Sequence, residues 1–156
     1  MKIYLLRHAE AENMSTSDHN RRLTAKGLKR TATAATVMVS LGIKPAHIYS
    51  SPRVRARQTA ELVADAMDMT VELDEEVNFG FSINSVESLI RGLGVDEDVM
   101  FVGHEPSMSA VAHGLCGASV VMKKGSLARI DLINRASLRG ELVWLIAPKV
   151  FDVLGA

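Results

Sequence analysis

The stretch Lys2-Ile3-Tyr4-Leu5-Leu6-Arg7-His8 decides the fold. Its short apolar run is typical of a buried β-strand, and the run ends abruptly in a cation and an imidazole. Open α/β sheets collect their ligands at the carboxyl ends of their strands. We therefore expect a sheet whose first strand delivers Arg7 and His8 to a binding site.

Two later stretches repeat this arrangement, each after an apolar run: Ser51-Pro52-Arg53-Val54-Arg55 and Val102-Gly103-His104-Glu105-Pro106. Taken alone, each is more often a structural or solvated group. Together they place arginine and histidine at three strand ends, which could meet at one sheet edge. Cations at a helix start are unfavourable unless an anion is bound there. The combination indicates a phosphate site.

The wider pattern alternates strands and helices. Six segments favour strands: Ile3–Leu6, Ile48–Ser50, Thr70–Leu73, Val99–Val102, Leu127–Ile133 and Leu142–Ile146. Four segments favour helices: one capped by Thr24 and ended by Gly42 and Pro45, one capped by Ser51 with Pro52 in its first turn, Ser85–Leu93, and Ser107–Leu115. The apolar stripes expected on the first two helices are Leu28, Ala32, Ala35 and Val39, then Ala56, Ala60, Val63 and Met67.

The last two strands follow one another directly, with a hairpin turn expected over Asn134–Gly140. Early β-α alternation with a late hairpin predicts a three-layer α/β/α sandwich, whose central sheet is mostly parallel with an antiparallel edge. No linker or repeat divides the 156 residues, so we expect a single domain over residues 1–156.

Composition narrows the functional classes. The formal net charge is zero, which argues against a general nucleic-acid binder. Cys116 is the only cysteine, which favours a reducing compartment. The apolar start is too short for a signal peptide, and no apolar run approaches membrane-spanning length. These features predict a cytoplasmic protein with no nucleic-acid or membrane partner.

Several other chemistries lack their motifs. After His104-Glu105 the next histidine is His113, too distant for the zinc-protease pattern. Met122 stands where a cysteine-based phosphatase loop starting at Cys116 would need arginine. The chain contains no nucleophile-elbow serine and no Walker loop. Gly92-Leu93-Gly94 precedes a strand, so it is not a dinucleotide fingerprint.

The remaining motifs resemble those of the histidine phosphatase superfamily, whose fold is also called phosphoglycerate-mutase-like. Its Arg-His-Gly signature corresponds here to Arg7-His8-Ala9, a mild departure. The chain is most similar to the short phosphohistidine phosphatases of the SixA type, over nearly its whole length. The stretches that carry the resemblance are Leu5–Glu10, Arg22–Gly27, Ser50–Pro52 with Arg55-Ala56 and Gln58–Ala60, and Val102–Pro106.

The resemblance implies a role for each matching residue. His8 would be the nucleophile, Arg7 and Arg55 would clamp the phosphate, and His104 would contact the same phosphoryl group. Such a reaction requires no metal and no cofactor. Arg53 and Arg57 do not fall on the clamp position, so we expect them to be surface or rim charges.

The proton donor is not specified by the sequence. Longer relatives supply a glutamate after the third strand, where this chain offers Glu75 and Glu76. Asp18 is a further candidate, and the alternative is that none of the three acts as a general acid. An alkoxide leaving group needs a proton in the transition state, whereas an imidazole, with a pKa of about 6.5, can depart already protonated. Weak acid catalysis therefore favours phosphohistidine as substrate.

The leading hypothesis is a phosphatase that acts on a phosphohistidine-bearing partner protein, admitted because no long insertion forms a lid. A phosphatase of small phosphate esters or anhydrides is the alternative within enzymes. A non-catalytic phosphate-binding module is a third reading, which the presence of His8 disfavours because binding alone needs no nucleophile. The oligomeric state and the pathway stay open.

Overall fold

Strand β1 (Lys2–Arg7) is an inner strand of a six-stranded sheet, and all four of its central residues are buried, as expected for its apolar run. The computed structural model describes residues 1–156, and the sheet order is β3-β2-β4-β1-β5-β6. β1 runs parallel to β4 and antiparallel to β5. The other strands are β2 (His47–Ser50), β3 (Glu72–Leu73), β4 (Val99–Gly103), β5 (Leu127–Asn134) and β6 (Arg139–Ile146).

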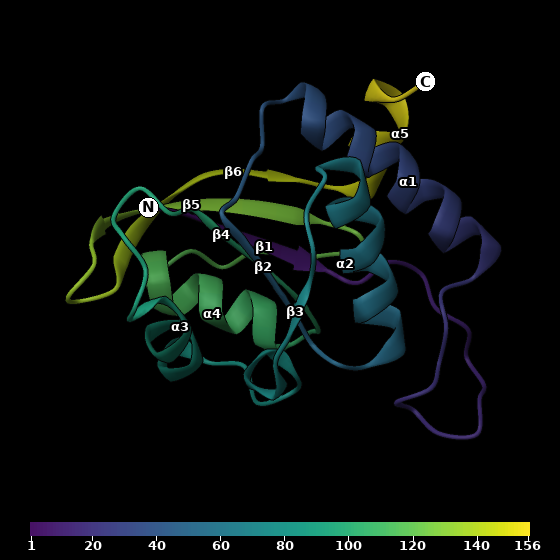
Figure 1. Cartoon of the computed structure of the whole chain (residues 1–156), viewed down its shortest axis with the longest axis horizontal. Helices are drawn as coiled ribbons and strands as arrows, with labels where there is room; N and C mark the ends of the chain where they lie inside the picture. The colour runs from purple at the N-terminus through teal and green to yellow at the C-terminus, as the bar shows by residue number, and fades with distance from the viewer.

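Helices cover both faces of this sheet (Figure 1). On one face lie α1 (Ala25–Ser40), α2 (Val54–Ala66) and α5 (Pro148–Leu154). On the other lie α3 (Ile83–Ile90) and α4 (Ser107–Cys116), with the short 3-10 helix η1 (Glu75–Val77) beside them. None of these helices is both long and apolar enough to cross a membrane. The predicted sandwich, with its parallel sheet and antiparallel edge, is confirmed.

The core divides into two layers because side chains alternate across a strand. Ile3 and Leu5 of β1 point into a cluster completed by α3 and α4. Tyr4 and Leu6 point the other way, into a cluster completed by α1, α2 and α5. Four methionines contribute to these clusters as buried residues: Met38, Met100, Met108 and Met122.

The stripe predicted for α1 is wrong at three of its four positions. Leu28, Ala32 and Val39 face solvent, and only Ala35 is buried. The buried face instead carries Gly27, Thr31, Ala34, Ala35, Val37 and Met38. The first turn of α1 lies so close to the β1–α1 connection that a Cβ at Gly27 would stand 2.2 Å from the Glu10 carbonyl oxygen. At this first turn the close approach requires glycine, which an apolar spacing pattern does not predict.

The predicted starts of two helices also shift. α2 begins at Val54 with Arg53 as its N-cap, because the Ser51 hydroxyl instead accepts the Arg53 N–H and bonds His104. α3 begins at Ile83, earlier than expected, with Ser82 and Ser85 capping each other. On α2, Ala56, Ala60 and Val63 are buried as expected, whereas Met67 lies beyond the helix. The terminal helix α5 was not predicted.

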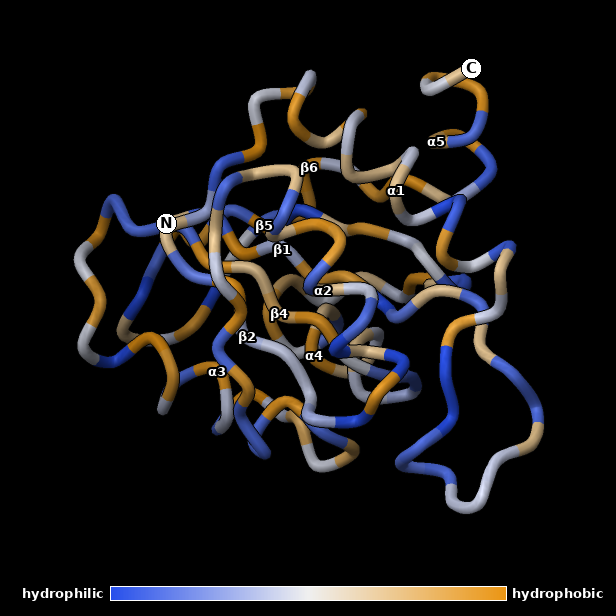
Figure 2. The backbone as a smooth tube through the Cα atoms, turned by 45° about the vertical axis from the view of Figure 1, so that its right-hand side comes forward, coloured by the Kyte–Doolittle hydropathy of each residue, from blue (hydrophilic) through white to orange (hydrophobic).

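The connection between β1 and α1 projects as a polar loop. Figure 2 shows it as a mostly hydrophilic arm at the lower right. Its base is closed by the Glu12 N–H donating to the Arg22 carbonyl at 2.8 Å and by a bridge between Ala11 and Leu23. The loop is anchored again where the Val54 N–H donates to the His19 carbonyl at 3.0 Å. This second anchor brings Asp18 to the start of α2.

Candidate functional site

Backbone hydrogen bonds align the three strand ends that were predicted to converge. The His8 N–H donates to the Gly103 carbonyl and the Ser51 N–H to the Val102 carbonyl, each at 3.0 Å. The first turn of α2 then places Arg55 against His8, with its Nε 3.4 Å from His8 Nε2. The rings of His8 and His104 lie 5.3 Å apart, centroid to centroid. The structure therefore brings these three predicted residues together.

His8 is held in one tautomer. Its Nδ1 lies 2.7 Å from the Ala9 carbonyl oxygen, which can only accept, so Nδ1 carries the proton in the neutral ring. The lone pair is then on Nε2, which faces Arg55. Burial, more than the charges of Arg55 and Arg7, lowers the pKa of His8 to about 4. His8 is therefore a neutral ring at physiological pH, and its Nε2 lone pair accepts the Arg55 Nε–H.

Ala9 occupies its place without strain. Its backbone is not in the left-handed region, and its methyl group packs in a small cluster with Ala11 and Leu23. Its N–H donates to the Thr59 hydroxyl at 3.1 Å. Alanine in place of the signature glycine therefore leaves the carbonyl that orients His8 in position.

His104 is buried beside Ser51. Its Nε2 is 2.8 Å from the Ser51 hydroxyl oxygen, which also accepts the Arg53 N–H. When the Ser51 hydroxyl donates to His104 Nε2, the ring proton of neutral His104 is on Nδ1. Burial, with the nearby charge of His8 and of Arg55, lowers the pKa of His104 to about 3.

The two predicted clamp arginines approach from different sides. Arg7 donates through one terminal nitrogen to the Met122 carbonyl at 2.9 Å. Arg55 is 4% exposed and donates to Asp18 twice, to its carbonyl at 2.9 Å and to its carboxylate at 3.2 Å. Asp18 therefore already engages the donors of Arg55 that a phosphate would need.

Three buried side-chain polar atoms in the molecule have no hydrogen-bond partner: Arg7 Nε, His104 Nδ1 and Ser126 Oγ. All three lie at this site or beside it, since the Ser126 carbonyl accepts the Arg7 N–H at 3.0 Å. Buried polar groups are otherwise nearly always paired. Arg7 Nε–H, and His104 Nδ1–H in the tautomer described above, are unpaired donors near the His8 imidazole, and such donors are suited to the oxygens of a bound oxyanion.

The rim of the site is formed by Arg53, Asp18, Asn78 and Phe79. Arg53 donates to the Asp18 carboxylate at 2.6 Å and to the Asn78 side-chain oxygen at 2.8 Å. Its guanidinium lies 4.0 Å from the centre of the Phe79 ring. Arg53 is thus a rim charge, as expected. Arg57 is an exposed residue paired with Glu61, also as expected.

The three candidate general acids, Asp18, Glu75 and Glu76, differ in their hydrogen-bond partners. Burial acts to raise the pKa of Asp18, but the hydrogen bond from Arg21 and the charges of Arg55 and Arg53 hold it below its ordinary value. Asp18 is therefore a carboxylate and a poor proton donor. Glu75 accepts from Asn78 at 2.7 Å, while Glu76 bonds neither histidine nor either clamp arginine. None of the three carboxyl groups bonds His8 or His104.

Sequence reasoning missed several contributors. The Met122 carbonyl, Ser126, Asn78 and Phe79 were not singled out, and Ser51 was assigned only as a helix cap. Backbone carbonyls leave no sequence signal. An aromatic residue inside the polar stretch Asp74–Gly80 was the available clue to Phe79.

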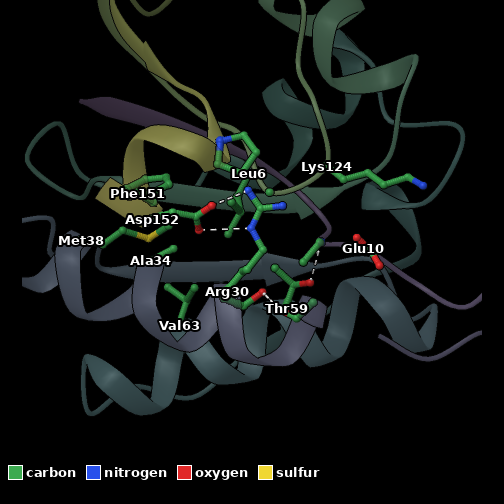
Figure 3. A pocket seen from close by; sticks show the side chains of 15 residues that line it. Leu6, Glu10, Arg30, Ala34, Met38, Thr59, Val63, Lys124, Phe151 and Asp152 are labelled. Carbon is green, nitrogen blue, oxygen red and sulfur yellow. Dashed lines mark hydrogen bonds and ion pairs between the residues drawn. The ribbon is translucent and has the colours of Figure 1, made fainter. Parts of the chain in front are cut away.

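A separate cavity lies behind the site, between β1, α1 and α5 (Figure 3). Leu6, Met38 and Phe151 line its apolar part, and Arg30 binds Asp152 through two hydrogen bonds of 3.1 and 2.7 Å at its edge. Neither histidine of the candidate site contributes to it. The cavity is therefore not the phosphate site.

Comparison with known proteins now identifies the family. The sequence profile of the histidine phosphatase superfamily (branch 1) matches residues 3–80, which is half of the chain. An uncharacterised protein of Picosynechococcus is 31% identical over 168 residues, covering 96% of this chain and 98% of that protein. The chain belongs to the histidine phosphatase superfamily.

Solved structures agree with this membership. The protein histidine phosphatase SixA complexed with tungstate superimposes with a TM-score of 0.86 at 21% identity, covering 96% of this chain and 98% of that one. A putative phosphohistidine phosphatase SixA from Agrobacterium tumefaciens superimposes with a TM-score of 0.79 at 26% identity, covering 94% of this chain and 97% of that one. The resemblance to SixA-type members seen in the sequence is confirmed, and the protein is a phosphatase of this superfamily.

Proposed function

We propose that this histidine phosphatase removes the phosphoryl group from phosphohistidine on a partner protein, through a covalent intermediate on His8. One observation carries the proposal. The Ala9 carbonyl holds the proton of His8 on Nδ1, so the lone pair of Nε2 is directed beside Arg55. A ring fixed in this way is prepared to form a bond to phosphorus.

The reaction would proceed in two displacements. The Nε2 lone pair of His8 forms a bond to phosphorus while the bond from phosphorus to the substrate imidazole breaks. The other ring nitrogen of that imidazole already carries a proton in the substrate, so the electron pair of the broken bond leaves on a neutral imidazole. Water then attacks phosphorus, the bond to Nε2 breaks, and inorganic phosphate and neutral His8 are released. Both steps transfer a group with charge on its equatorial oxygens.

Arg7, Arg55 and His104 would stabilise that charge. Arg7 Nε and His104 Nδ1 are buried donors without partners, so phosphoryl oxygens could satisfy both. Arg55 would exchange its bonds to Asp18 for bonds to the phosphoryl group. Donors that are fixed before the substrate arrives need no reorganisation in the transition state. Such preorganised donors are usually the largest source of transition-state stabilisation.

The acid groups support phosphohistidine over alkyl phosphates. Asp18, the carboxyl group bonded to Arg55, is held ionised by its arginine neighbours. A leaving imidazole carries its own proton, whereas an alkoxide does not. The structural similarity to SixA proteins, named as histidine and phosphohistidine phosphatases, points the same way. Small phosphate esters or anhydrides are the alternative substrates.

The test compares two substrates and two variants. Wild-type protein, His8→Ala and the exposed-site control His113→Ala are incubated with a labelled phosphohistidine protein and with an alkyl phosphate. We expect much faster turnover of phosphohistidine, acid-labile label trapped on wild type and His113→Ala, and neither turnover nor label with His8→Ala. Turnover that survives in His8→Ala would refute the nucleophile, and equal rates on both substrates would refute the substrate class.

The setting of this reaction is also a proposal. A partner protein that carries phosphohistidine would meet the enzyme in the cytoplasm, which the single cysteine Cys116 favours. Residues 1–156 would act as one histidine phosphatase domain. Cell fractionation and the activity of this chain alone test the two statements.

A further inference from the structure

Phe79 is an exposed aromatic residue at the edge of the phosphate site. Half of it is accessible to solvent (51%). Its ring meets His104 edge-on, with 4.8 Å between centroids, and lies 5.8 Å from the guanidinium carbon of Arg55. Phe79 therefore adjoins two of the groups proposed to hold the phosphoryl oxygens, yet the proposed chemistry gives it no role.

Phe79 is fixed through its backbone and not through burial. Its N–H donates to the Asn78 side-chain oxygen at 2.9 Å, and its carbonyl accepts the Ser107 hydroxyl at 2.8 Å. Ser107 opens α4, the helix that follows His104, so Phe79 is tied to the same element as the second histidine. An aromatic ring held this firmly can bind a partner without first paying for its own ordering.

Arg53 extends the surface of this ring. Its guanidinium lies over Phe79, and Asp18 and Asn78 hold it there through hydrogen bonds. The Asp18 carboxylate offsets the charge of Arg53. We call this stacked pair, Phe79 with Arg53, the ledge. It offers a flat, partly apolar surface at the rim, of the kind on which aromatic rings and cations stack.

We propose that the ledge receives the leaving group, and that Phe79 determines specificity for substrates whose leaving group is a flat ring. This inference rests on the proposed function, because in-line attack by His8 places the leaving group on the opposite side of phosphorus. With the oxygens held by Arg55 and His104, the departing imidazole would leave beside the Phe79 ring, which meets His104 edge-on and lies 5.8 Å from the Arg55 guanidinium carbon. Stacking on Phe79 would favour a departing ring, charged or neutral, over a leaving group without one.

The experiment uses two small substrates that share a phosphorus–nitrogen bond. N-phosphoimidazole has a ring in its leaving group, and phosphoramidate has none. Wild type, Phe79→Ala, Phe79→Leu and Phe79→Trp are compared by kcat/KM on both. Phe79→Leu keeps apolar bulk against His104, and Phe79→Trp keeps an aromatic face. Inhibition by inorganic phosphate reports whether the phosphate site itself is intact.

We expect kcat/KM on N-phosphoimidazole to fall about five- to tenfold in Phe79→Ala and Phe79→Leu, which is the effect expected from the loss of one stacking contact. Their kcat/KM on phosphoramidate and their phosphate inhibition should change less than twofold, and Phe79→Trp should stay close to wild type. Equal losses on both substrates would mean that Phe79 only supports His104, and would overturn the inference. No loss on either would overturn it as well.

Failure of the proposed function gives a different pattern. If wild type hydrolyses alkyl phosphates as fast as N-phosphoimidazole, the phosphohistidine proposal fails. The ledge is then tested with phenyl phosphate and methyl phosphate as substrates. A lower kcat/KM of Phe79→Ala and Phe79→Leu on phenyl phosphate alone would support the ledge, and equal changes on both esters would overturn it.

Discussion

At the scale of the residue, one carbonyl and a buried setting explain the state of His8. The Ala9 carbonyl selects the tautomer, and burial keeps the ring neutral. The charges of Arg55 and Arg7 also lower the pKa of His8, but they contribute less than burial does. Burial lowers the pKa of His8 whether or not a substrate anion is bound, whereas a bound anion would offset the charges of the arginines.

This setting makes stability depend on pH. His8 and His104 have folded pKa values of about 4 and about 3, below the value of about 6.5 in an unfolded chain. Between these limits the unfolded state binds more protons, so the free energy of unfolding should fall as pH drops below about 6.5, by up to about 1.4 kcal/mol per pH unit for each histidine. Urea denaturation from pH 7 to pH 4.5 measures the slope.

His104→Gln removes one of the two titrating rings. We expect it to reduce the slope by about half, with the histidine contribution lost as pH falls and fully present above pH 7. The exposed-site control His113→Gln should leave the slope unchanged. A slope in His104→Gln equal to that of wild type would contradict the assignment of a neutral buried ring.

Asp18 gives a second residue-scale prediction. Its carboxylate engages Arg55 and Arg53, so an incoming phosphate must compete with it and is also repelled by its charge. Asp18→Asn should tighten inhibition by inorganic phosphate by about five- to tenfold, the effect of about 1 kcal/mol. Asp65→Asn, an exposed position on α2, serves as control. Weaker inhibition in Asp18→Asn would instead assign Asp18 to positioning Arg55.

At the scale of the element, the sequence predicted the strands better than the helix faces. β1 and β4 are continuous apolar runs with both faces buried, so their pattern has one interpretation. α1 was misread because its buried face includes Gly27, Thr31 and Ala34 beside Val37 and Met38, while Leu28 and Val39 are exposed. Apolar spacing cannot report how closely two segments approach, which is what decides such a face.

The site was predictable to the extent that it depends on strand ends. His8, Arg55 and His104 were found because each follows a recognisable strand or opens a recognisable helix. Asn78 and Phe79 were not, because they lie in an irregular stretch after η1 and reach the site only through tertiary contacts with Arg53 and α4. Ser51 was misassigned because a capping serine and a histidine partner have the same local sequence.

Gly103 at the end of β4 gives an element-scale prediction. It keeps an ordinary strand backbone, so it is needed for close approach and not for a tight turn. A Cβ there would lie 2.8 Å from both the Val77 carbonyl oxygen and the Met108 methyl carbon. Gly103→Ala should lower the free energy of unfolding by about 1–3 kcal/mol through overpacking, and it should weaken activity because His104 is the next residue.

Gly92 is the matched control for Gly103. A Cβ at Gly92 would meet nothing within 4 Å. Gly92→Ala should therefore change neither the free energy of unfolding in urea nor kcat/KM. If Gly103→Ala behaves like Gly92→Ala, then η1 and α4 are not packed on the end of β4 as described.

At the scale of the whole molecule, the sheet separates stability from chemistry. Its two faces carry the two large apolar clusters, while the site occupies one edge at the strand ends. α5 belongs to the structural part: Phe151 is buried beneath it, and Asp152 ties it to Arg30 of α1 at the edge of the cavity in Figure 3. A change in α5 should therefore act on stability and leave the reaction at His8 almost untouched.

Phe151→Ala tests this separation. Loss of a fully buried phenylalanine should lower the free energy of unfolding by about 3–5 kcal/mol. Phe151 shares the cavity lining with Ala9, but His8, Arg55 and His104 are not part of that lining. The kcat/KM of the folded protein at low temperature should therefore stay within about twofold, well under one tenfold step of 1.4 kcal/mol. Asp152→Asn, which breaks only a half-exposed ion pair, should cost about 0–1 kcal/mol and leave kcat/KM unchanged. A large drop in kcat/KM for Phe151→Ala, measured where denaturation curves show it folded, would mean that the cavity behind β1 is coupled to the catalytic edge of the sheet.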